Sequence, residues 1–400
     1  MSKKHTIIFD GNYFFHKTLY VLPNESKGKL LESKNDQSTF IGKLALDFAA
    51  EIRRFKPILK RIVFVIDSSS WRKDFYPEQA YKGNRVPSDN IDWSSFYNCI
   101  DEFSTILKNK GMIIHRVPGA EGDDLVFAWS KALNLEGDNV IIVSGDGDLM
   151  QLVDYNESTK AHTIFYTKNR MSKKIVGYPG FIDWLKSDIS NEITNIFEMN
   201  QTIHGDNITK TLLKDLVKKH QLQTITVNSN EFIFKKILSG DAGDNIKSVY
   251  WYEKNGRRYG VSDKKADRVW DVLTEKHKDF KSIYLFDKSY REEVAKIIIH
   301  ELNATKMTYQ DILNNIENNT MLIMLHSRAI PQQIQQQMFK DIEVFSKLQQ
   351  DINNFVTKES ILKDTEHVNN VFVPSQFNFF KDDEEDNFDI KDIISDNSLF

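Results

Sequence analysis

The stretch Asn139-Val-Ile-Ile-Val-Ser-Gly-Asp-Gly-Asp148 decides the fold of this chain. Its first half is rich in Ile and Val and predicts a short buried strand, and its second half is a glycine-spaced turn that carries two acids. The same order of apolar run and closing acid occurs upstream, in Thr6-Ile-Ile-Phe-Asp10 and in Ile62-Val-Phe-Val-Ile-Asp67. We therefore expect several strands of one sheet to end at acidic side chains.

Helical patterns alternate with strand-like runs over the first half of the chain. The expected strands are His5–Phe9, Arg61–Ile66, Met112–Arg116 and Asn139–Val143, and the expected helices are Phe40–Phe55, Trp93–Asn109 and Asp123–Leu133. This alternation is typical of a parallel sheet with helices on both faces. It predicts an α/β domain over residues 1–176.

The second half of the chain has a different pattern. Residues 177–230 are mixed and polar, and we interpret them as an inserted helical segment. Residues 231–364 have mainly helical periodicity, including one helix opened by Pro331. Residues 371–400 carry eight acids against two lysines, so we expect 365–400 to form a disordered acidic tail.

Composition excludes several classes of protein. With 400 residues, 40% of them hydrophobic, the chain is long enough for about two or three domains. Cys99 is the only cysteine and the ten histidines show no ligand spacing, which argues against an intramolecular disulfide and a thiolate zinc site. No apolar run is long enough for a membrane span or a signal-peptide core. We expect a cytoplasmic monomer without membrane contact.

The acids that follow the strands should converge, because the carboxyl ends of parallel strands lie at one edge of a sheet. Glu121 and Asp124 lie three residues apart at a helix start, and Asp146 and Asp148 lie two apart in a turn, so each pair can point to one place. A single acid at a strand end is usually a helix cap or a turn residue. Several together would repel one another unless cations bound them, and hard divalent cations prefer oxygen ligands. We hypothesise two Mg²⁺ ions, for which Mn²⁺ can substitute.

Taken in order, the acidic and basic motifs resemble the flap endonuclease and 5′-3′ exonuclease family, especially its phage ribonuclease H type. The resemblance rests on six segments: Phe9-Asp10, Ile66-Asp67, Tyr81-Lys-Gly-Asn-Arg85, Glu121-Gly-Asp-Asp124, Ser144-Gly-Asp-Gly-Asp148 and Gly240-Asp-Ala-Gly-Asp-Asn245. The last of these, taken alone, is equally well explained as a polar turn. The resemblance implies a PIN-like parallel-sheet nuclease domain, a helical arch at about residues 71–100, and a helix-three-turn-helix that binds duplex DNA within 231–364. It also implies the host cytoplasm if the protein is phage-encoded.

The resemblance assigns roles to individual side chains. It implies that nine acids hold the two metal ions directly or through water: Asp10, Asp67, Glu121, Asp123, Asp124, Asp146, Asp148, Asp241 and Asp244. Lys82 and Arg85 are expected to meet the scissile phosphate as catalytic cations, although an exposed basic helix face is the alternative.

Nucleic-acid contacts are expected from two further places. Arg72 and Tyr81, in a segment that mixes cations with aromatic rings, should hold a single strand. Lys264, Lys265 and Arg268 should contact duplex phosphates near a helix start. One departure from the family pattern lies between these places. Tyr250-Trp-Tyr-Glu-Lys-Asn-Gly-Arg-Arg258 stands where relatives have a glycine-rich hairpin, as a basic and aromatic insertion.

The tail contains a second resemblance. Gln376-Phe-Asn-Phe-Phe380 is similar to a sliding-clamp-binding peptide, in which Gln376, Phe379 and Phe380 would be the anchors. The acidic end of the chain also resembles tips that bind replication partners such as single-strand-binding proteins. A solvated tail without a partner is the alternative.

These observations lead to one expected function. We expect a Mg²⁺-dependent 5′-3′ exonuclease and flap endonuclease with ribonuclease H activity, which removes RNA primers and 5′ flaps during DNA replication by two-metal phosphodiester hydrolysis. Its substrates would be branched or nicked DNA and RNA–DNA hybrids. The alternatives are a PIN-type ribonuclease and a non-catalytic structure-specific DNA-binding protein.

Overall fold

The structure is a computed structural model that describes residues 4–22, 28–75, 80–168, 172–186 and 202–367, with the backbone alone for 75 and 202–209. Apart from its first three positions, the expected acidic tail, with Gln376, Phe379 and Phe380, lies outside the described residues. In the described part of the chain, no helix combines the length and the apolar character needed to cross a membrane.

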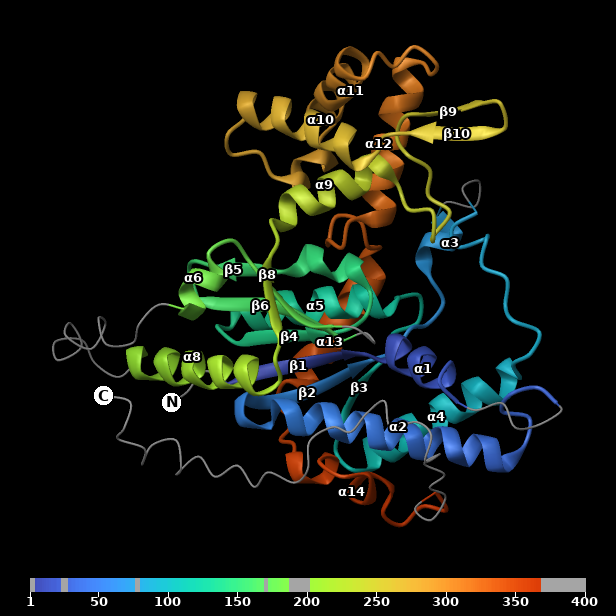
Figure 1. Cartoon of the computed structure of the whole chain (residues 1–400), viewed down its shortest axis with the longest axis vertical. Coiled ribbons are helices and arrows are strands. Elements are labelled where there is room, and N and C mark those ends of the chain that lie inside the picture. The colour runs from blue at the N-terminus through green and yellow to red at the C-terminus, as the bar shows by residue number, and fades with distance from the viewer. Residues whose placement is uncertain (1–3, 23–27, 76–79, 169–171, 187–201, 368–400) are drawn as a thin grey trace.

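A mostly parallel sheet forms the centre of the larger part of the molecule (Figure 1). The strands are β1 His5–Asp10, β2 Leu59–Val65, β3 Ile113–His115, β4 Asn139–Val143, β5 Asp154–Asn156, β6 Ala161–Lys168, β7 Lys173–Gly177 and β8 Gln223–Thr226. Their order is β3-β2-β1-β4-β6-β7-β8, with β5 paired to β6. Strands β3, β2, β1, β4 and β6 are parallel, whereas β5 and β7 are antiparallel to β6. The four strands expected from the sequence are confirmed as a parallel set.

Helices cover this sheet on both faces. They are α1 Gly11–Leu19, α2 Lys34–Phe55, α3 Trp71–Phe75, α4 Trp93–Asn109, α5 Gly122–Leu135, α6 Phe181–Lys186 and α8 Thr202–Lys219, with the 3-10 turns η1 Lys56–Ile58 and η3 Gly147–Leu152. All six residues of β1 are buried, because β2 and β4 flank the strand and helices pack above and below it. The carboxyl end of β1 is therefore a fixed point from which the site can be described.

Two segments differ in detail from expectation. The region expected as a helical insertion, 177–230, contains α6 and α8 but also β8, which pairs in parallel with β7 and extends the sheet. In the region expected as a helical arch, α3 has five residues, and residues 80–92 consist of turns and irregular chain before α4 begins. We call residues 80–92 the strap.

A second hydrophobic core lies in the helices at the top of Figure 1. Its elements are α9 Ser229–Ser239, α10 Asp263–Lys276, η5 Ser282–Phe286, α11 Lys288–Glu301 and α12 Tyr309–Ile323, and the two-stranded hairpin of β9 Trp251–Lys254 and β10 Arg257–Gly260 joins α9 to α10. The expected helical region is confirmed. Its first two helices are connected by a β-hairpin instead of a glycine-rich turn.

The last described elements return to the sheet. These are α13 Gln332–Phe345, η6 Ile352–Phe355 and α14 Lys358–Leu362; α13 packs on α5 and α14 packs on α2. The Gln350 amide bonds both backbone groups of Ile62 on β2, donating to the carbonyl (2.9 Å) and accepting from the N–H (2.8 Å). Residues 325–362 thus share the core of the first part of the chain, although the sequence grouped them with the helices of 231–364.

Candidate active site

Asp10 and Ser144 join two neighbouring strand ends. Asp10 closes β1 and caps α1, where its carboxylate accepts a hydrogen bond from the N–H of Tyr13 (3.2 Å). Its other oxygen accepts the hydroxyl of Ser144 (2.6 Å), which follows β4. The same Ser144 oxygen accepts the N–H of Asp146 (2.9 Å). Asp10 and the turn that carries Asp146 are therefore positioned together by one buried hydroxyl.

Asp123 lies at the centre of the acids. It stands in the first turn of α5, and it has no hydrogen bond with any residue that the structure describes. Burial raises the pKa of the Asp123 carboxyl well above its usual value, and the charges of Asp146, Asp10, Asp67 and Glu121 raise it further. Acids that are far apart in the sequence thus act on one another here.

The pKa values of two neighbours of Asp123 are also raised. Burial, followed by the charge of Glu121, raises the pKa of Asp67 to about 7, although the N–H of Gly122 donates to it. Burial also raises the pKa of Asp10, and the charge of Asp146 adds to this effect. The acids expected at the strand ends thus lie near enough to affect one another, and Asp10, Asp67 and Asp123 bind protons more tightly than free carboxyls do.

Glu121 differs from these acids because cations surround it. Its carboxylate accepts hydrogen bonds from Arg72 (2.9 Å), the Tyr81 hydroxyl (3.0 Å) and the Lys82 ammonium (2.5 Å). Burial alone would raise the pKa of Glu121, but Arg72 and Lys82 hold it below its usual value. Glu121 is therefore ionised and already neutralised by the protein.

Asp124 and Arg72 form a buried ion pair behind the cluster. Arg72 is 2% exposed, and its two terminal nitrogens lie 2.8 and 3.1 Å from the two oxygens of Asp124, which also accepts the indole N–H of Trp71 (3.1 Å). The expected nucleic-acid contact of Arg72 is corrected, because this side chain is inside the protein and holds acids. The expected nucleic-acid contact of Tyr81 is corrected for the same reason, because its side chain is 6% exposed and its hydroxyl donates to Glu121.

The strap is held against the loop after α9. The backbone N–H of Lys82 donates to the Asp244 carbonyl (2.9 Å), Asn84 donates to the Ala242 carbonyl (2.9 Å), and Arg85 pairs with the Asp244 carboxylate. Lys82 has a positive φ of 57°, which turns its side chain inward to Glu121. Burial disfavours the charged ammonium, but Glu121 and Asp244 raise the pKa of Lys82. Lys82 thus contacts Glu121 and Arg85 contacts Asp244, and the catalytic roles of both cations stay predictions.

Lys236 joins the outer acids. Its ammonium lies 2.6 Å from Asp148 and 2.8 Å from Asp241, so it links the turn after β4 to the loop after α9. Burial raises the pKa of Asp148 to about 6 against the effect of Lys236. The pKa of Asp241 is lowered, because Lys236 outweighs its burial. These two acids are less available to an ion than Asp10 or Asp123.

Sequence reasoning missed Ser144 and Lys236. Ser144 lies inside a quoted motif, and a small hydroxyl residue between a strand and an acid-bearing turn is a usable signal. Lys236 is close in sequence to Asp241 but 88 residues from Asp148, and nothing local in the sequence marks the pairing with Asp148.

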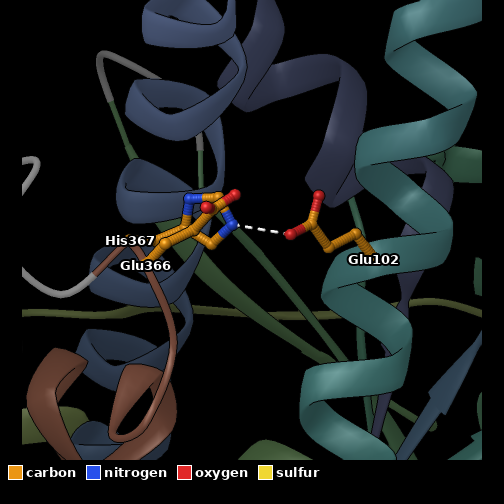
Figure 2. A group of neighbouring side chains, drawn as sticks. All are labelled: Glu102, Glu366 and His367. Carbon is orange, nitrogen blue, oxygen red and sulfur yellow. Dashed lines mark hydrogen bonds and ion pairs between the residues drawn. The ribbon is translucent and has the colours of Figure 1, made fainter.

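The ligand atoms of the acid cluster do not converge on one point. In the described ranges, the one set of three His, Asp or Glu ligand atoms within 4.8 Å of one another is Glu102, Glu366 and His367 (Figure 2). Both ring nitrogens of His367 have protein partners there, the Ser38 hydroxyl (2.8 Å) and Glu102 (2.7 Å). We assign His367 to fastening the end of the described chain between α2 and α4.

The three expected duplex contacts on α10 have different surroundings. The ammonium of Lys265 donates to the Gly260 carbonyl (3.0 Å), and Arg268 donates to the Glu301 carbonyl (3.3 Å). Lys264 is exposed, and it has no ion pair with a residue that the structure describes.

Comparison with known proteins agrees with this arrangement. Residues 5–177 match the family model of the 5′-3′ exonuclease N-terminal resolvase-like domain. The 5′-3′ exonuclease of Buchnera aphidicola subsp. Schizaphis graminum is 26% identical over 202 residues, covering 49% of this chain and 66% of that protein. The 5′-3′ exonuclease of Aquifex aeolicus is 25% identical over 195 residues, covering 48% and 64%. The chain therefore spans somewhat less than two thirds of the length of these curated relatives.

One solved structure gives the fold. The flap endonuclease of bacteriophage T5, determined as a pseudo-enzyme–product complex with DNA and metal ions, aligns over 86% of this chain and 100% of its own with a TM-score of 0.50 and 16% identity. The order of motifs, the parallel sheet with acids at its carboxyl edge, and the family match over residues 5–177 agree. Residues 5–177 therefore match the 5′-3′ exonuclease N-terminal resolvase-like domain, and the chain shares the fold of the bacteriophage T5 flap endonuclease.

Proposed function

We propose that this protein is a divalent-metal-dependent 5′-nuclease that hydrolyses phosphodiester bonds in branched or nicked DNA and in RNA–DNA hybrids. The observation that carries the proposal is Asp123, a half-buried carboxyl without a hydrogen-bond partner among the described residues, whose pKa is raised by the charges of acids from several other segments. A carboxyl so placed must take a proton or a cation near neutral pH. A purely structural acid would have a donor, as Asp124 has in Arg72.

The chemistry of the donors fits hard divalent ions. The acids of the site that form no ion pair with a described lysine or arginine offer only carboxylate oxygens as ligands. Oxygen ligands of this kind suit Mg²⁺ and Mn²⁺. In the proposal, Asp10, Asp123 and Asp146 hold two ions most directly, with Asp67 and Asp148 acting nearby or through water. Such ions, when bound, activate a water and stabilise the charge on the leaving 3′ oxygen.

The protein cations prepare the same place for a phosphate. Lys82 is charged, half-buried and directed at Glu121, so it supplies a fixed positive charge beside the acid cluster. Arg85 is 59% exposed on the strap and offers a planar fork to phosphate oxygens. Lys236 forms ion pairs with Asp148 and Asp241, whereas Asp10 and Asp123 have no such partner in the described part of the chain and are left for the metal ions. We propose that Lys82 and Arg85 orient the scissile phosphate.

The substrate class extends the proposal to replication. Relatives named 5′-3′ exonuclease and DNA polymerase I support the removal of RNA primers and 5′ flaps as the task of this chain. Sequence-specific cleavage is not expected, since the sequence contains no base-reading motif.

The proposal is tested by incubating the purified protein with a 5′-labelled flap, a blunt duplex and an RNA–DNA hybrid, with Mg²⁺ or with EDTA. We expect products from the flap and the hybrid with Mg²⁺ and none with EDTA. Cleavage confined to single-stranded RNA would instead support a PIN-type ribonuclease. Flap binding without any cleavage would support a non-catalytic DNA-binding protein.

Metal uptake is tested separately from activity. Isothermal titration of the parent protein with Mg²⁺ should show binding that the double variant Asp146→Asn, Asp148→Asn has lost. Asp279→Asn, at an exposed acid in the second core region, is the matched control and should bind as the parent does. Equal uptake by the double variant would count against the metal site.

A sliding clamp or a single-strand-binding protein stays a predicted partner of the tail beyond residue 367. A protein that ends at residue 367 should lose any stimulation of cleavage by such a partner and keep its basal activity. Full stimulation without the tail would remove this part of the proposal.

A further inference from the structure

The β9–β10 hairpin is the element that the proposed function leaves unexplained. It stands away from the helices of the second core in Figure 1. Its tip is Asn255-Gly256, and both residues have a positive φ, 53° and 69°. Asn-Gly with this geometry is the preferred tight turn of a two-residue hairpin. The hairpin is therefore a regular element encoded locally.

The base of the hairpin is fixed to the protein. Tyr250 is 4% exposed in the second core, and the N–H of Trp251 donates to the sulfur of Met307 (3.2 Å). The Ser248 hydroxyl donates to the Tyr250 carbonyl (2.9 Å) and accepts the N–H of Val261 (2.9 Å), so it ties the two strand ends together. A hairpin held in this way presents its outer residues in a defined geometry.

One face of the hairpin is internally neutralised. Side chains alternate between the faces of a strand, and Arg258 lies opposite Glu253 in the register. Their charged groups are 3.7 Å apart. The guanidinium of Arg258 also lies 5.3 Å from the centre of the Trp251 ring, and the ammonium of Lys247 lies 4.3 Å from it. The cations near this face are already engaged with an acid or a ring.

The opposite face carries charge without compensation. Lys254 lies opposite Arg257, and Tyr252 lies opposite Tyr259. Lys254 and Arg257 are exposed, and within the described part of the chain neither has an ion pair. The rings of Tyr252 and Tyr259 are stacked at 5.3 Å with 14° between their planes, and Tyr252 also contacts the ring of Tyr250. This face offers two positive charges beside rings that already pack on one another.

The hairpin continues from the loop that meets the strap. Asp244 bonds the strap, and the chain reaches β9 seven residues later, with the exposed Lys264 following β10. The loop before the hairpin therefore contacts the strap, which in turn places Lys82 at Glu121. Two cations beside rings that already stack on one another match a run of phosphates better than unpaired bases, which stack on rings that have no protein partner.

We propose that the face formed by Tyr252, Lys254, Arg257 and Tyr259 binds the phosphate backbone of the double-stranded arm of the substrate. This inference rests on the proposed function for the identity of the substrate. It adds a duplex contact in the segment where relatives have a glycine-rich hairpin.

The test is the salt dependence of binding in EDTA, which requires no cleavage. The probe is a fluorescent duplex with a 5′ flap, followed by anisotropy. For the double variant Lys254→Ala, Arg257→Ala we expect the slope of log affinity against log salt to become shallower by about 1.8, since each phosphate contact contributes about 0.9. At moderate salt we expect affinity to fall roughly tenfold or more. An unchanged slope would overturn the inference.

Two control variants separate the face from net charge. The first, Glu253→Ala with Arg258→Ala, alters the other face without changing the charge of the protein, and its slope should equal that of the parent. The second, Lys340→Ala with Lys347→Ala, removes two exposed charges from α13 and its end. If the second control lowers the slope as much as the hairpin variant does, the effect is one of net charge and the inference fails.

A footprint places the hairpin on the substrate. Cys99 is the only cysteine and is 1% exposed, so Glu253→Cys provides a single reactive thiol for an iron chelate. We expect radical cleavage of the double-stranded arm; cleavage confined to the single strand would overturn the inference. If the protein binds with the expected salt slopes but cuts no substrate, the nuclease proposal is refuted and the inference about the hairpin stands.

Discussion

Strand β1 begins at His5 and ends at Asp10. One end therefore carries a basic side chain and the other an acidic one, and both side chains are buried. His5 is 0% exposed and its Nε2 lies 2.8 Å from that of His162, while its Nδ1 has no hydrogen-bond partner in the structure. Asp10 is 7% exposed at the acid cluster. Burial, with His162 adding to it, lowers the pKa of His5 well below its usual value, whereas burial raises that of Asp10.

The comparison shows that burial favours the neutral form at both ends of the strand, with different consequences for histidine and for aspartate. At the amino end, loss of a proton leaves a neutral pair that is stable near pH 7. At the carboxyl end, neutrality requires protons or bound cations, because the acids outnumber the protein cations that face them. Four predictions test this difference, in order of decreasing effect.

The largest expected effect is on catalysis at the carboxyl end. Lys82→Ala should slow single-turnover cleavage of the flap substrate by about 10²–10³-fold, because it removes a fixed cation at the reacting phosphate. Its affinity for the same substrate in EDTA should change far less. Lys340→Ala is the control and should alter neither quantity. A variant that loses more affinity than rate would reject the catalytic role.

The second prediction concerns stability at the same end. Asp123→Asn should abolish Mg²⁺-dependent cleavage and yet raise the free energy of unfolding in EDTA at pH 8, by roughly 1–3 kcal/mol, because it removes a half-buried charge that has no donor and is repelled by neighbouring acids. Urea unfolding measures this, with the exposed Asp279→Asn as the control. A less stable Asp123→Asn protein would show that the carboxylate has a structural partner.

The third prediction is the pH dependence of the metal-free protein. The folded state holds protons on Asp10, Asp67 and Asp123 more tightly than the unfolded chain does. The stability that these protons contribute is complete below about pH 4 and is lost as the pH rises through about 7, the pKa of Asp67. The melting temperature in EDTA should therefore fall over this window. Mg²⁺ should restore it at high pH, and a profile without this restoration would contradict the metal site.

The smallest expected effect is at the amino end. Below about pH 6.5 a histidine in the unfolded chain takes up a proton, whereas buried His5 does not. The contribution of neutral His5 to the free energy of unfolding is therefore present above that pH and is lost as the pH falls. His5→Leu should lessen the acid loss, change stability at pH 8 by less than about 1.5 kcal/mol, and leave cleavage intact. His300→Leu, at a side chain 87% exposed, is the control. Reduced cleavage by His5→Leu would mean that the two ends are not independent.

The sequence predicted the elements whose signal is local. The strand at Asn139–Val143 and the helix at Trp93–Asn109 have the expected bounds, because runs of branched apolar residues and a capping acid act within a few residues. The convergence of acids followed from parallel strands alone. The hairpin strands around Asn255-Gly256 carry an equally local signal, which the comparison with the family pattern obscured.

Pairings between distant residues could not be predicted. Arg72 has the sequence surroundings of an exposed cation, and only the position of Asp124 on another element makes it a buried one. Lys236 is on α9, far in sequence from Asp148. The helix predicted to begin at Pro331 is present as α13, but the segment after Phe345, which joins the core of the first part of the chain, was grouped with the helices of 231–364.

The packing of α13 on α5 and of α14 on α2 also has a consequence for folding during synthesis. The helices of the second core are complete once residue 324 has emerged from the ribosome, whereas the sheet, translated first, still lacks the segment that covers α5 and α2. Part of the hydrophobic core around the sheet therefore stays exposed to solvent until residues 325–362 have been synthesised. Fragments that stop near residue 177, where the family match ends, should for the same reason be poorly soluble.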